Sequence, residues 1–212
     1  MLNGTLKIAE VFYSLQGEGG LAGSPFVFVR LAGCNMACGY CDTDHSMHEK
    51  LTDMELLSDI QKIGRGCKRI LWTGGEPLLQ LDQFVIDEFN KAGYFQTIET
   101  NGSMPLLKRL DYVSISPKFN PDEGGWAQSM SAFLLMADST SWPNEVRICV
   151  PEMGWLRRMS PFPKFPAWRS YLSPNTETDE YPGILEECIR FCLENPRWSL
   201  SVQQHKKLWK IK

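Results

Sequence analysis

The sequence has no long apolar run and no surplus of basic residues over its 212 positions. A transmembrane helix needs about 20 consecutive, predominantly apolar residues. No segment approaches that length, so we expect no membrane association. The net charge of −3 argues against a nucleic-acid partner, because nucleic-acid-binding domains usually carry a basic patch. Residues 1–7 lack the charged-then-apolar pattern of a signal peptide, which favours a cytoplasmic location.

The seven cysteines cannot all pair with one another, because their count is odd. Without a signal peptide, an odd count argues against a disulfide framework. Three cysteines fall within a stretch of eight residues, Cys34 to Cys41, and such a cluster in a reducing compartment indicates a metal site. The other four are interpreted as small apolar residues that pack in the core: Cys67, Cys149, Cys188 and Cys192.

Along the chain, short apolar segments alternate with segments of helical periodicity, and no internal repeat is visible. We expect strands at residues 27–31, 69–72, 95–99, 112–115, 146–150, 168–172 and 199–202, and helices at 52–63, 81–92 and 183–193. Thr52 and Glu55 form a possible capping box. Alternating strands and helices predict βα units with a parallel sheet in one α/β domain over residues 1–212. Residues 119–168, rich in Pro, Trp, Ser and Met, are expected to be an irregular insertion.

Polar or glycine-rich residues follow three successive predicted strands. These segments are Thr73-Gly74-Gly75-Glu76-Pro77, Glu99-Thr100-Asn101-Gly102 and Ser116-Pro117-Lys118. In a parallel β/α barrel the active site gathers at the carboxyl ends of the strands. The three segments are therefore expected to meet in one site.

The cysteine cluster has the spacing C-x₃-C-x₂-C, formed by Cys34, Cys38 and Cys41. Three thiolates can hold three irons of a cubane cluster and leave the fourth iron free to bind a substrate or cofactor, whereas ordinary clusters have four cysteine ligands. A structural zinc site is the alternative. It requires four ligands, and His45 or His48 is available as the fourth.

Two motifs together resemble the radical S-adenosylmethionine superfamily. The first is the cysteine motif with an aromatic residue, Tyr40, before its last cysteine, and the second is Gly74-Gly75-Glu76-Pro77 at the end of the next predicted strand. The resemblance implies a [4Fe–4S] cluster on the three cysteines and S-adenosylmethionine bound to its open iron.

Four further stretches resemble the 7-carboxy-7-deazaguanine synthases: residues 12–19, 28–35, 41–43 and 204–206. The resemblance implies ring contraction of 6-carboxy-5,6,7,8-tetrahydropterin to 7-carboxy-7-deazaguanine with release of ammonia, a lyase reaction in queuosine-type biosynthesis. It also implies Mg²⁺, a homodimer, a flavodoxin- or ferredoxin-type electron donor, and an incomplete TIM-like β/α barrel. The short chain agrees with that fold, because a full barrel usually takes about 250 residues.

The same resemblance implies roles for individual residues. No side chain is assigned as catalytic, since the 5′-deoxyadenosyl radical abstracts the hydrogen. Thr43 is expected to bind Mg²⁺, and Glu76 to accept a hydrogen bond from the methionine ammonium. Contacts to S-adenosylmethionine are expected from Tyr40, Asp42, Gly75, Glu76, Glu99, Asn101, Ser116, Pro117, Lys118, Ser173, Pro174 and Asn175. Contacts to the pterin are expected from Leu15, Gln16, Gly17, Glu18, Arg30, Thr73 and His205.

Each of these roles has a plainer alternative. Residues 16–19 alone indicate a polar turn, Arg30 a structural ion pair, and Thr43 a loop hydroxyl. Ser173 stands where the family often has Gln. Two other function classes also remain open at this stage: an enzyme that activates a glycyl-radical protein, and a zinc-binding module without catalytic activity.

Overall fold

A computed structural model describes residues 4–119, 143–159 and 169–209. In these ranges nine strands form one sheet in the order β3-β1-β2-β4-β5-β6-β7-β8-β9. From β2 to β9 neighbouring strands are parallel, whereas β1 is antiparallel to both β2 and β3. The strands are β1 (Thr5–Leu15), β2 (Pro25–Leu31), β3 (Glu49–Thr52), β4 (Arg69–Gly74), β5 (Phe95–Thr100), β6 (Tyr112–Ile115), β7 (Glu145–Val150), β8 (Arg169–Pro174) and β9 (Trp198–Leu200).

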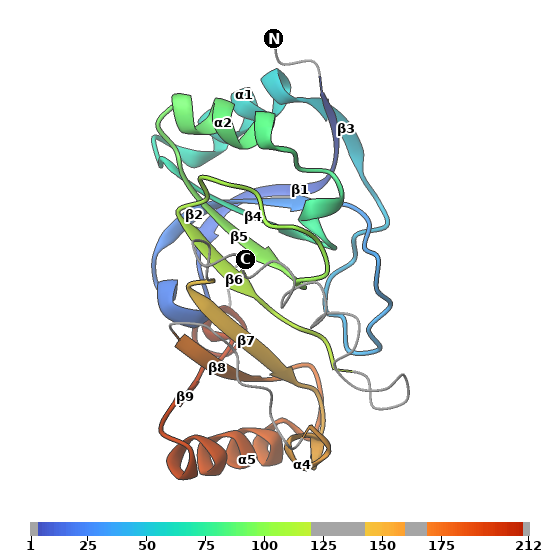
Figure 1. Ribbon diagram of the computed structural model, residues 1–212, viewed down its shortest axis with the longest axis vertical. Coiled ribbons are helices and arrows are strands. Elements are labelled where there is room, and N and C mark those ends of the chain that lie inside the picture. The colour runs from blue at the N-terminus through green and yellow to red at the C-terminus, as the bar shows by residue number, and fades with distance from the viewer. Residues whose placement is uncertain (1–3, 120–142, 160–168, 210–212) are drawn as a thin grey trace.

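The sheet does not close into a barrel, because β3 and β9 lie at its two ends. This is the incomplete β/α barrel predicted from the sequence. In Figure 1, α1 and α2 lie beside the β1–β5 half of the sheet, and α4 and α5 lie at the β7–β9 end. The helices are α1 (Asp53–Gly64), α2 (Gln83–Lys91), α4 (Trp155–Arg158) and α5 (Tyr181–Glu194).

The predicted capping box begins α1. The Thr52 hydroxyl accepts a hydrogen bond from the Glu55 backbone N–H at 3.3 Å, and the Glu55 carboxylate accepts one from the Thr52 N–H at 2.8 Å. These bonds pair backbone donors that a helix N-terminus otherwise leaves without partners. Thr52 and Glu55 thus set the residue at which α1 begins, directly after β3.

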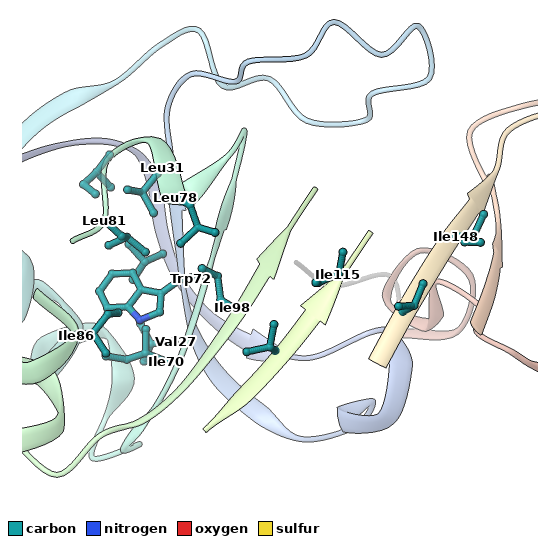
Figure 2. Packing of buried hydrophobic residues seen from close by; sticks show 14 of the residues in the cluster. Val27, Leu31, Ile70, Trp72, Leu78, Leu81, Ile86, Ile98, Ile115 and Ile148 are labelled. Atoms are coloured by element: carbon teal, nitrogen blue, oxygen red, sulfur yellow. The ribbon is translucent and has the colours of Figure 1, made fainter. Parts of the chain in front are cut away.

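The core lies between the sheet and the helices. Figure 2 shows Trp72 of β4 among aliphatic side chains, including Ile70 and Ile86. The indole N–H donates to the Gln96 side-chain oxygen at 3.0 Å, and the Gln96 amide donates to the Ile86 carbonyl at 2.8 Å. Burial of Gln96 is tolerated because its polar atoms are hydrogen-bonded. Residues 26–29 of β2 and residues 70–72 of β4 form continuous buried apolar runs, as expected of parallel strands covered on both faces.

All the predicted strands and helices are present, with ends shifted by a few residues. β9 ends earlier than predicted, at Leu200, and β1 and β3 were not predicted. Residues 119–168 are not irregular throughout, since they include β7 and α4; residues 120–142 and 160–168 lie outside the described ranges. Cys188 is buried on α5 and Cys192 packs against the core, which confirms their structural interpretation. Among the described helices, none has the length and apolar character required to cross a bilayer.

Candidate active site

One cavity of about 530 Å³ brings together most of the predicted site residues. Sixteen of them line it: Glu18, Cys34, Cys38, Tyr40, Cys41, Asp42, Thr43, Thr73, Gly75, Glu99, Asn101, Ser116, Lys118, Ser173, Pro174 and Asn175. The other seven do not line it: Leu15, Gln16, Gly17, Arg30, Glu76, Pro117 and His205. The three strand-end segments therefore do meet, as their positions after parallel strands predicted.

The three clustered cysteines lie on the loop after β2 and line this cavity. Burial raises the pKa of the Cys38 thiol, and the positive charge of Lys118 opposes that shift. Among the described residues, no three His, Cys, Asp or Glu side chains are placed to hold a single metal ion. A cubane cluster makes a different demand, because each of its irons takes one thiolate. Three thiols on one wall beside a lysine fit such a cluster.

Gly75 allows the end of β4 to touch the start of this cysteine loop. Its backbone N–H donates to the Leu31 carbonyl at 3.1 Å, and a Cβ added to it would lie 1.9 Å from the Gly33 carbonyl oxygen and 3.0 Å from the Cys34 Cβ. Backbone atoms cannot move aside as the end of a side chain can. Glycine is therefore required at position 75 for the loop to lie where it does.

Glu76 is fully buried, and the structure gives its carboxylate partners inside the protein. It accepts hydrogen bonds from the Leu78 N–H at 3.0 Å, the Thr100 hydroxyl at 2.8 Å and the Asn101 N–H at 2.8 Å. The expected contact with a methionine ammonium is not what this geometry favours. Glu76 instead connects the carboxyl ends of β4 and β5.

Asn101 extends that connection to the cysteine loop. Its side-chain amide donates to the Asn35 side-chain oxygen at 3.0 Å, and the Asn35 amide donates to the Ser103 hydroxyl at 2.8 Å. Asn35 directly follows the first cluster cysteine. The end of β5 therefore helps to position the loop that carries the thiols.

Arg147, in the middle of β7, was not predicted as a site residue. It lines the cavity, and its guanidinium lies 3.4 Å from the Glu18 carboxylate, 2.6 Å from that of Glu99 and 3.2 Å from that of Glu145. Burial alone would raise the pKa of Glu99, but the Arg147 charge and its hydrogen bonds lower it overall. The available sequence signal was a single arginine in the apolar strand Glu145–Val150, because a buried arginine needs a partner.

Glu18 lines the cavity although its loop lies at the amino ends of the parallel strands, opposite the carboxyl ends at which the site was expected. Its loop follows β1 and contacts the amino ends of the parallel strands, where the Gly20 N–H donates to Glu145, the first residue of β7, at 2.8 Å. The Glu18 carboxylate also accepts a hydrogen bond from the Ser173 hydroxyl. Ser173, in doubt from the sequence, thus contacts another predicted site residue.

Arg30 and Thr43 form a separate contact at the cavity edge. The Arg30 guanidinium donates to the Thr43 hydroxyl at 3.0 Å and lies 3.7 Å from the Glu10 carboxylate. Thr43 lines the cavity but Arg30 does not. The ion pair with Glu10 agrees with the structural interpretation of Arg30, whereas its contact with the substrate stays a prediction.

The C-terminal residues complete the cavity wall. Gln203 lines the cavity, and the Gln204 N–H donates to the Gly17 carbonyl at 3.1 Å. His205 packs so closely that a Cβ added to Gly17 would lie 2.0 Å from its Nδ1, and burial lowers the pKa of this imidazole. Lys206 lies 2.7 Å from the Asp42 carboxylate, next to the last cluster cysteine. Neither Gln203 nor Lys206 was predicted as a site residue, although residues 204–206 carried part of the family resemblance and His205 was assigned to the site.

Two other cavity residues change the interpretation given from the sequence. Cys149, expected to be a packing residue, lines the cavity, and burial raises the pKa of its thiol to about 12. Tyr40 packs edge-on against Trp155 with ring centroids 6.3 Å apart. Its ring is therefore held on the cavity wall by α4 rather than free to move with the loop.

Comparison with known proteins agrees with this geometry. The family model of the radical SAM superfamily matches residues 29–131, which include the cysteine motif and the ends of β4 and β5. A 7-carboxy-7-deazaguanine synthase from Bacteroides thetaiotaomicron is 34% identical over 200 residues, covering 94% of this chain and 96% of the relative. The chain belongs to the 7-carboxy-7-deazaguanine synthase family.

Other similar proteins agree with this assignment. The 7-carboxy-7-deazaguanine synthase from Neisseria meningitidis serogroup B is 35% identical over 214 residues, covering 96% of this chain and 93% of the relative. The crystal structure of QueE from Escherichia coli matches with a TM-score of 0.72, covering 93% of each chain at 24% identity, and supports the fold. Radical SAM family membership implies a [4Fe–4S] cluster and S-adenosylmethionine as cofactors.

Proposed function

We propose that the protein is a 7-carboxy-7-deazaguanine synthase, which converts 6-carboxy-5,6,7,8-tetrahydropterin to 7-carboxy-7-deazaguanine with release of ammonia. The observation that carries this proposal is the composition of the cavity. Three thiols lie on the loop after β2, and two carboxylates, Glu18 and Glu99, lie in the same cavity against one buried arginine. The three thiols suit an iron–sulfur cluster, and the two carboxylates suit a neutral heterocycle with several N–H donors.

Cys34, Cys38 and Cys41 would hold the cluster. Bound there, the cluster supplies the electron that cleaves S-adenosylmethionine to methionine and a 5′-deoxyadenosyl radical. The protein's part is to orient the reacting molecules and exclude water. Residues proposed to contact S-adenosylmethionine are those of the predicted set that line the cavity beside the thiols: Tyr40, Asp42, Gly75, Asn101, Ser116, Lys118, Ser173, Pro174 and Asn175. Glu76 and Pro117 do not line the cavity and are proposed to position residues that do: Asn101 for Glu76, and Ser116 and Lys118 for Pro117.

Substrate recognition is assigned to Glu18 and Thr73, and also to Glu99 in place of the contact to S-adenosylmethionine expected from the sequence. An ionised carboxylate is purely an acceptor and can take two N–H bonds, as the amino-pyrimidinone edge of a pterin offers. The Thr73 hydroxyl donates to Glu99 at 3.3 Å and lines the cavity. Gln16 donates to the same carboxylate at 2.8 Å, and so contributes to its position from outside the cavity lining. Leu15, Gly17 and His205 are proposed to shape this end of the site.

The substrate carboxylate is assigned to the Arg30–Thr43 edge, with Mg²⁺ at Thr43. Magnesium prefers oxygen ligands and is usually bound by few protein groups together with substrate and water. The Thr43 hydroxyl is such an oxygen, and Arg30 can supply a charge-assisted hydrogen bond to a carboxylate. The proposal also includes the carbon–nitrogen lyase class, a flavodoxin- or ferredoxin-type donor, a homodimer and a cytoplasmic location, all supported by the family resemblance.

The test is turnover after anaerobic reconstitution with iron and sulfide. The sample is incubated with S-adenosylmethionine, Mg²⁺, a reductant and 6-carboxytetrahydropterin. We expect 7-carboxy-7-deazaguanine and ammonia in equal amounts, measured by mass spectrometry and an ammonia assay. Cleavage of S-adenosylmethionine without any deazaguanine product would leave the cofactor chemistry standing and overturn the proposed substrate.

A further inference from the structure

The buried charges around Arg147 do not balance. One guanidinium contacts three carboxylates, at 3.4 Å for Glu18, 2.6 Å for Glu99 and 3.2 Å for Glu145. The Arg147 side chain is 9% exposed and that of Glu145 only 2%. Buried charges are costly unless they are paired and hydrogen-bonded. The arrangement of Arg147 and its three carboxylates therefore calls for an explanation. The three carboxylates differ in what else they contact.

Glu145 faces away from the cavity and has protein partners throughout. It accepts hydrogen bonds from the Tyr112 hydroxyl at 2.8 Å, the Ser114 hydroxyl at 2.9 Å and the Gly20 N–H at 2.8 Å. The Ser114 hydroxyl in turn accepts a bond from the Arg147 guanidinium at 2.9 Å. Glu145, from outside the cavity lining, and Ser114, from within it, thus both hold the Nη2 side of the guanidinium.

Glu18 and Glu99 are the two carboxylates that line the cavity. They come from distant parts of the chain, the loop after β1 and the strand β5. The Nη1 atom of Arg147 contacts Glu18 and its Nη2 atom contacts Glu99. A planar guanidinium can contact two carboxylates from two nitrogens at a fixed separation, which a single ammonium cannot reproduce.

We infer that Arg147 is a positioning residue for the proposed reaction: it holds Glu18 and Glu99 side by side, so that together they accept N–H groups of the substrate. This inference rests on the proposed function and deepens it. Two carboxylates share one guanidinium at the cavity wall, which leaves a surplus of acceptors there. The wall therefore favours the N–H-bearing edge of a neutral heterocycle over an anionic group.

The experiment compares Arg147→Lys with Arg109→Lys in the reconstituted holoenzyme. Arg109 also pairs with a carboxylate, that of Asp87 at 3.3 Å, but its side chain is 59% exposed. We expect Arg147→Lys to raise KM for the pterin about tenfold or more, with kcat changed about threefold or less, because it weakens binding of the heterocycle before and during reaction. Iron content and substrate-free cleavage of S-adenosylmethionine should match the wild type, and Arg109→Lys should change none of these values.

Ser114→Ala provides a milder second variant if Arg147→Lys does not fold. It removes one hydrogen bond to the guanidinium and should raise KM about threefold to tenfold while leaving substrate-free cleavage unchanged. An unchanged KM in either folded variant would overturn the inference. A rise in KM that is accompanied by comparable losses of substrate-free cleavage and thermal stability would also overturn it, since that pattern indicates a structural role. The wild type is assayed first, and if it does not convert the pterin, the proposed function fails whatever the variants do.

Discussion

The Arg30 guanidinium donates a hydrogen bond to the Thr43 hydroxyl over 3.0 Å, and so connects β2 to the loop directly after the last cluster cysteine. Arg30 is the penultimate residue of β2, and Thr43 is two residues after Cys41. Because they are in contact, the effects of changing them should not add. Substitutions at Arg30 and Thr43 therefore need to be measured singly and together.

Thr43→Ala should weaken the dependence of turnover on Mg²⁺ and leave the iron content unchanged. The proposed oxygen ligand is lost, whereas the thiols are not touched. Turnover measured against Mg²⁺ concentration checks this expectation, with iron analysis on the same sample. An unchanged response would make Thr43 only the hydrogen-bond acceptor of Arg30.

Arg30→Lys should reduce kcat/KM even though the charge is retained. Loss of a charge-assisted hydrogen bond costs roughly 1.5–3 kcal/mol, which corresponds to about tenfold to a hundredfold. Substrate-free cleavage of S-adenosylmethionine should survive. Glu10→Gln is the matched control, because it breaks the Arg30–Glu10 ion pair and leaves the Thr43 contact in place. If Glu10→Gln has the same effect, the ion pair rather than the substrate contact is what matters.

Substitution of Cys34, Cys38 or Cys41 by alanine should abolish the cluster and all cleavage of S-adenosylmethionine. Each thiol is assigned to one iron, so no other ligand can compensate. Iron and sulfide analysis after reconstitution measures the loss. Cys192→Ala on α5 serves as the control, because Cys192 packs against the core away from the cavity. Full iron content in any of the three variants would refute the assignment of that cysteine.

Gly17→Ala should destabilise the protein by about 1–3 kcal/mol, the usual cost of overpacking. The added Cβ would lie 2.0 Å from the His205 imidazole. The double variant Gly17→Ala with His205→Ala removes this clash, so its loss should be smaller than the sum of the two single losses. Chemical denaturation of all four proteins completes the cycle. Additive losses would mean that His205 does not pack on Gly17.

The stability that Glu99 contributes should depend on pH. Although burial would raise its pKa, Arg147, Gln16 and Thr73 lower it below the unfolded value. A lowered pKa means that the contribution is present above the unfolded pKa of about 4.3 and is lost as pH falls through the folded pKa. The difference in unfolding free energy between wild type and Glu99→Gln should therefore shrink below about pH 4.3. A difference that stays constant or grows on acidification would contradict the ionised state of Glu99.

The sequence predicted the parts of the site that lie on contiguous segments. Cys34 to Cys41 and Gly74 to Pro77 are such segments, because each is a short motif of neighbouring residues. Arg147 and its contacts with Glu18 and Glu99 could not be predicted in this way. Arg147, Glu18 and Glu99 meet only because β5, β7 and the loop after β1 surround one cavity. Sequence spacing carries no information about a contact between residues 18 and 147.

The same distinction applies to the fold. Central strands such as β4 are continuous apolar runs and were predicted within two residues of their ends. β1 was missed because Lys7 and Glu10 interrupt its apolar residues, as expected near the edge of a sheet, where one side remains accessible to water. Its pairing with β2 is an antiparallel contact that the alternation of strands and helices does not suggest.

The bond between Gln204 and Gly17 has a consequence for protein synthesis. The ribosome makes the loop after β1 early and the segment from Gln203 to Lys206 close to two hundred residues later, yet the two lie side by side in the finished wall. A domain generally folds as a unit, so this one is not complete until its last segment has emerged. A nascent chain can thus expose Cys34, Cys38 and Cys41 long before the wall around them exists. The wall around these thiols is thus complete only after the C-terminal segment has been synthesised.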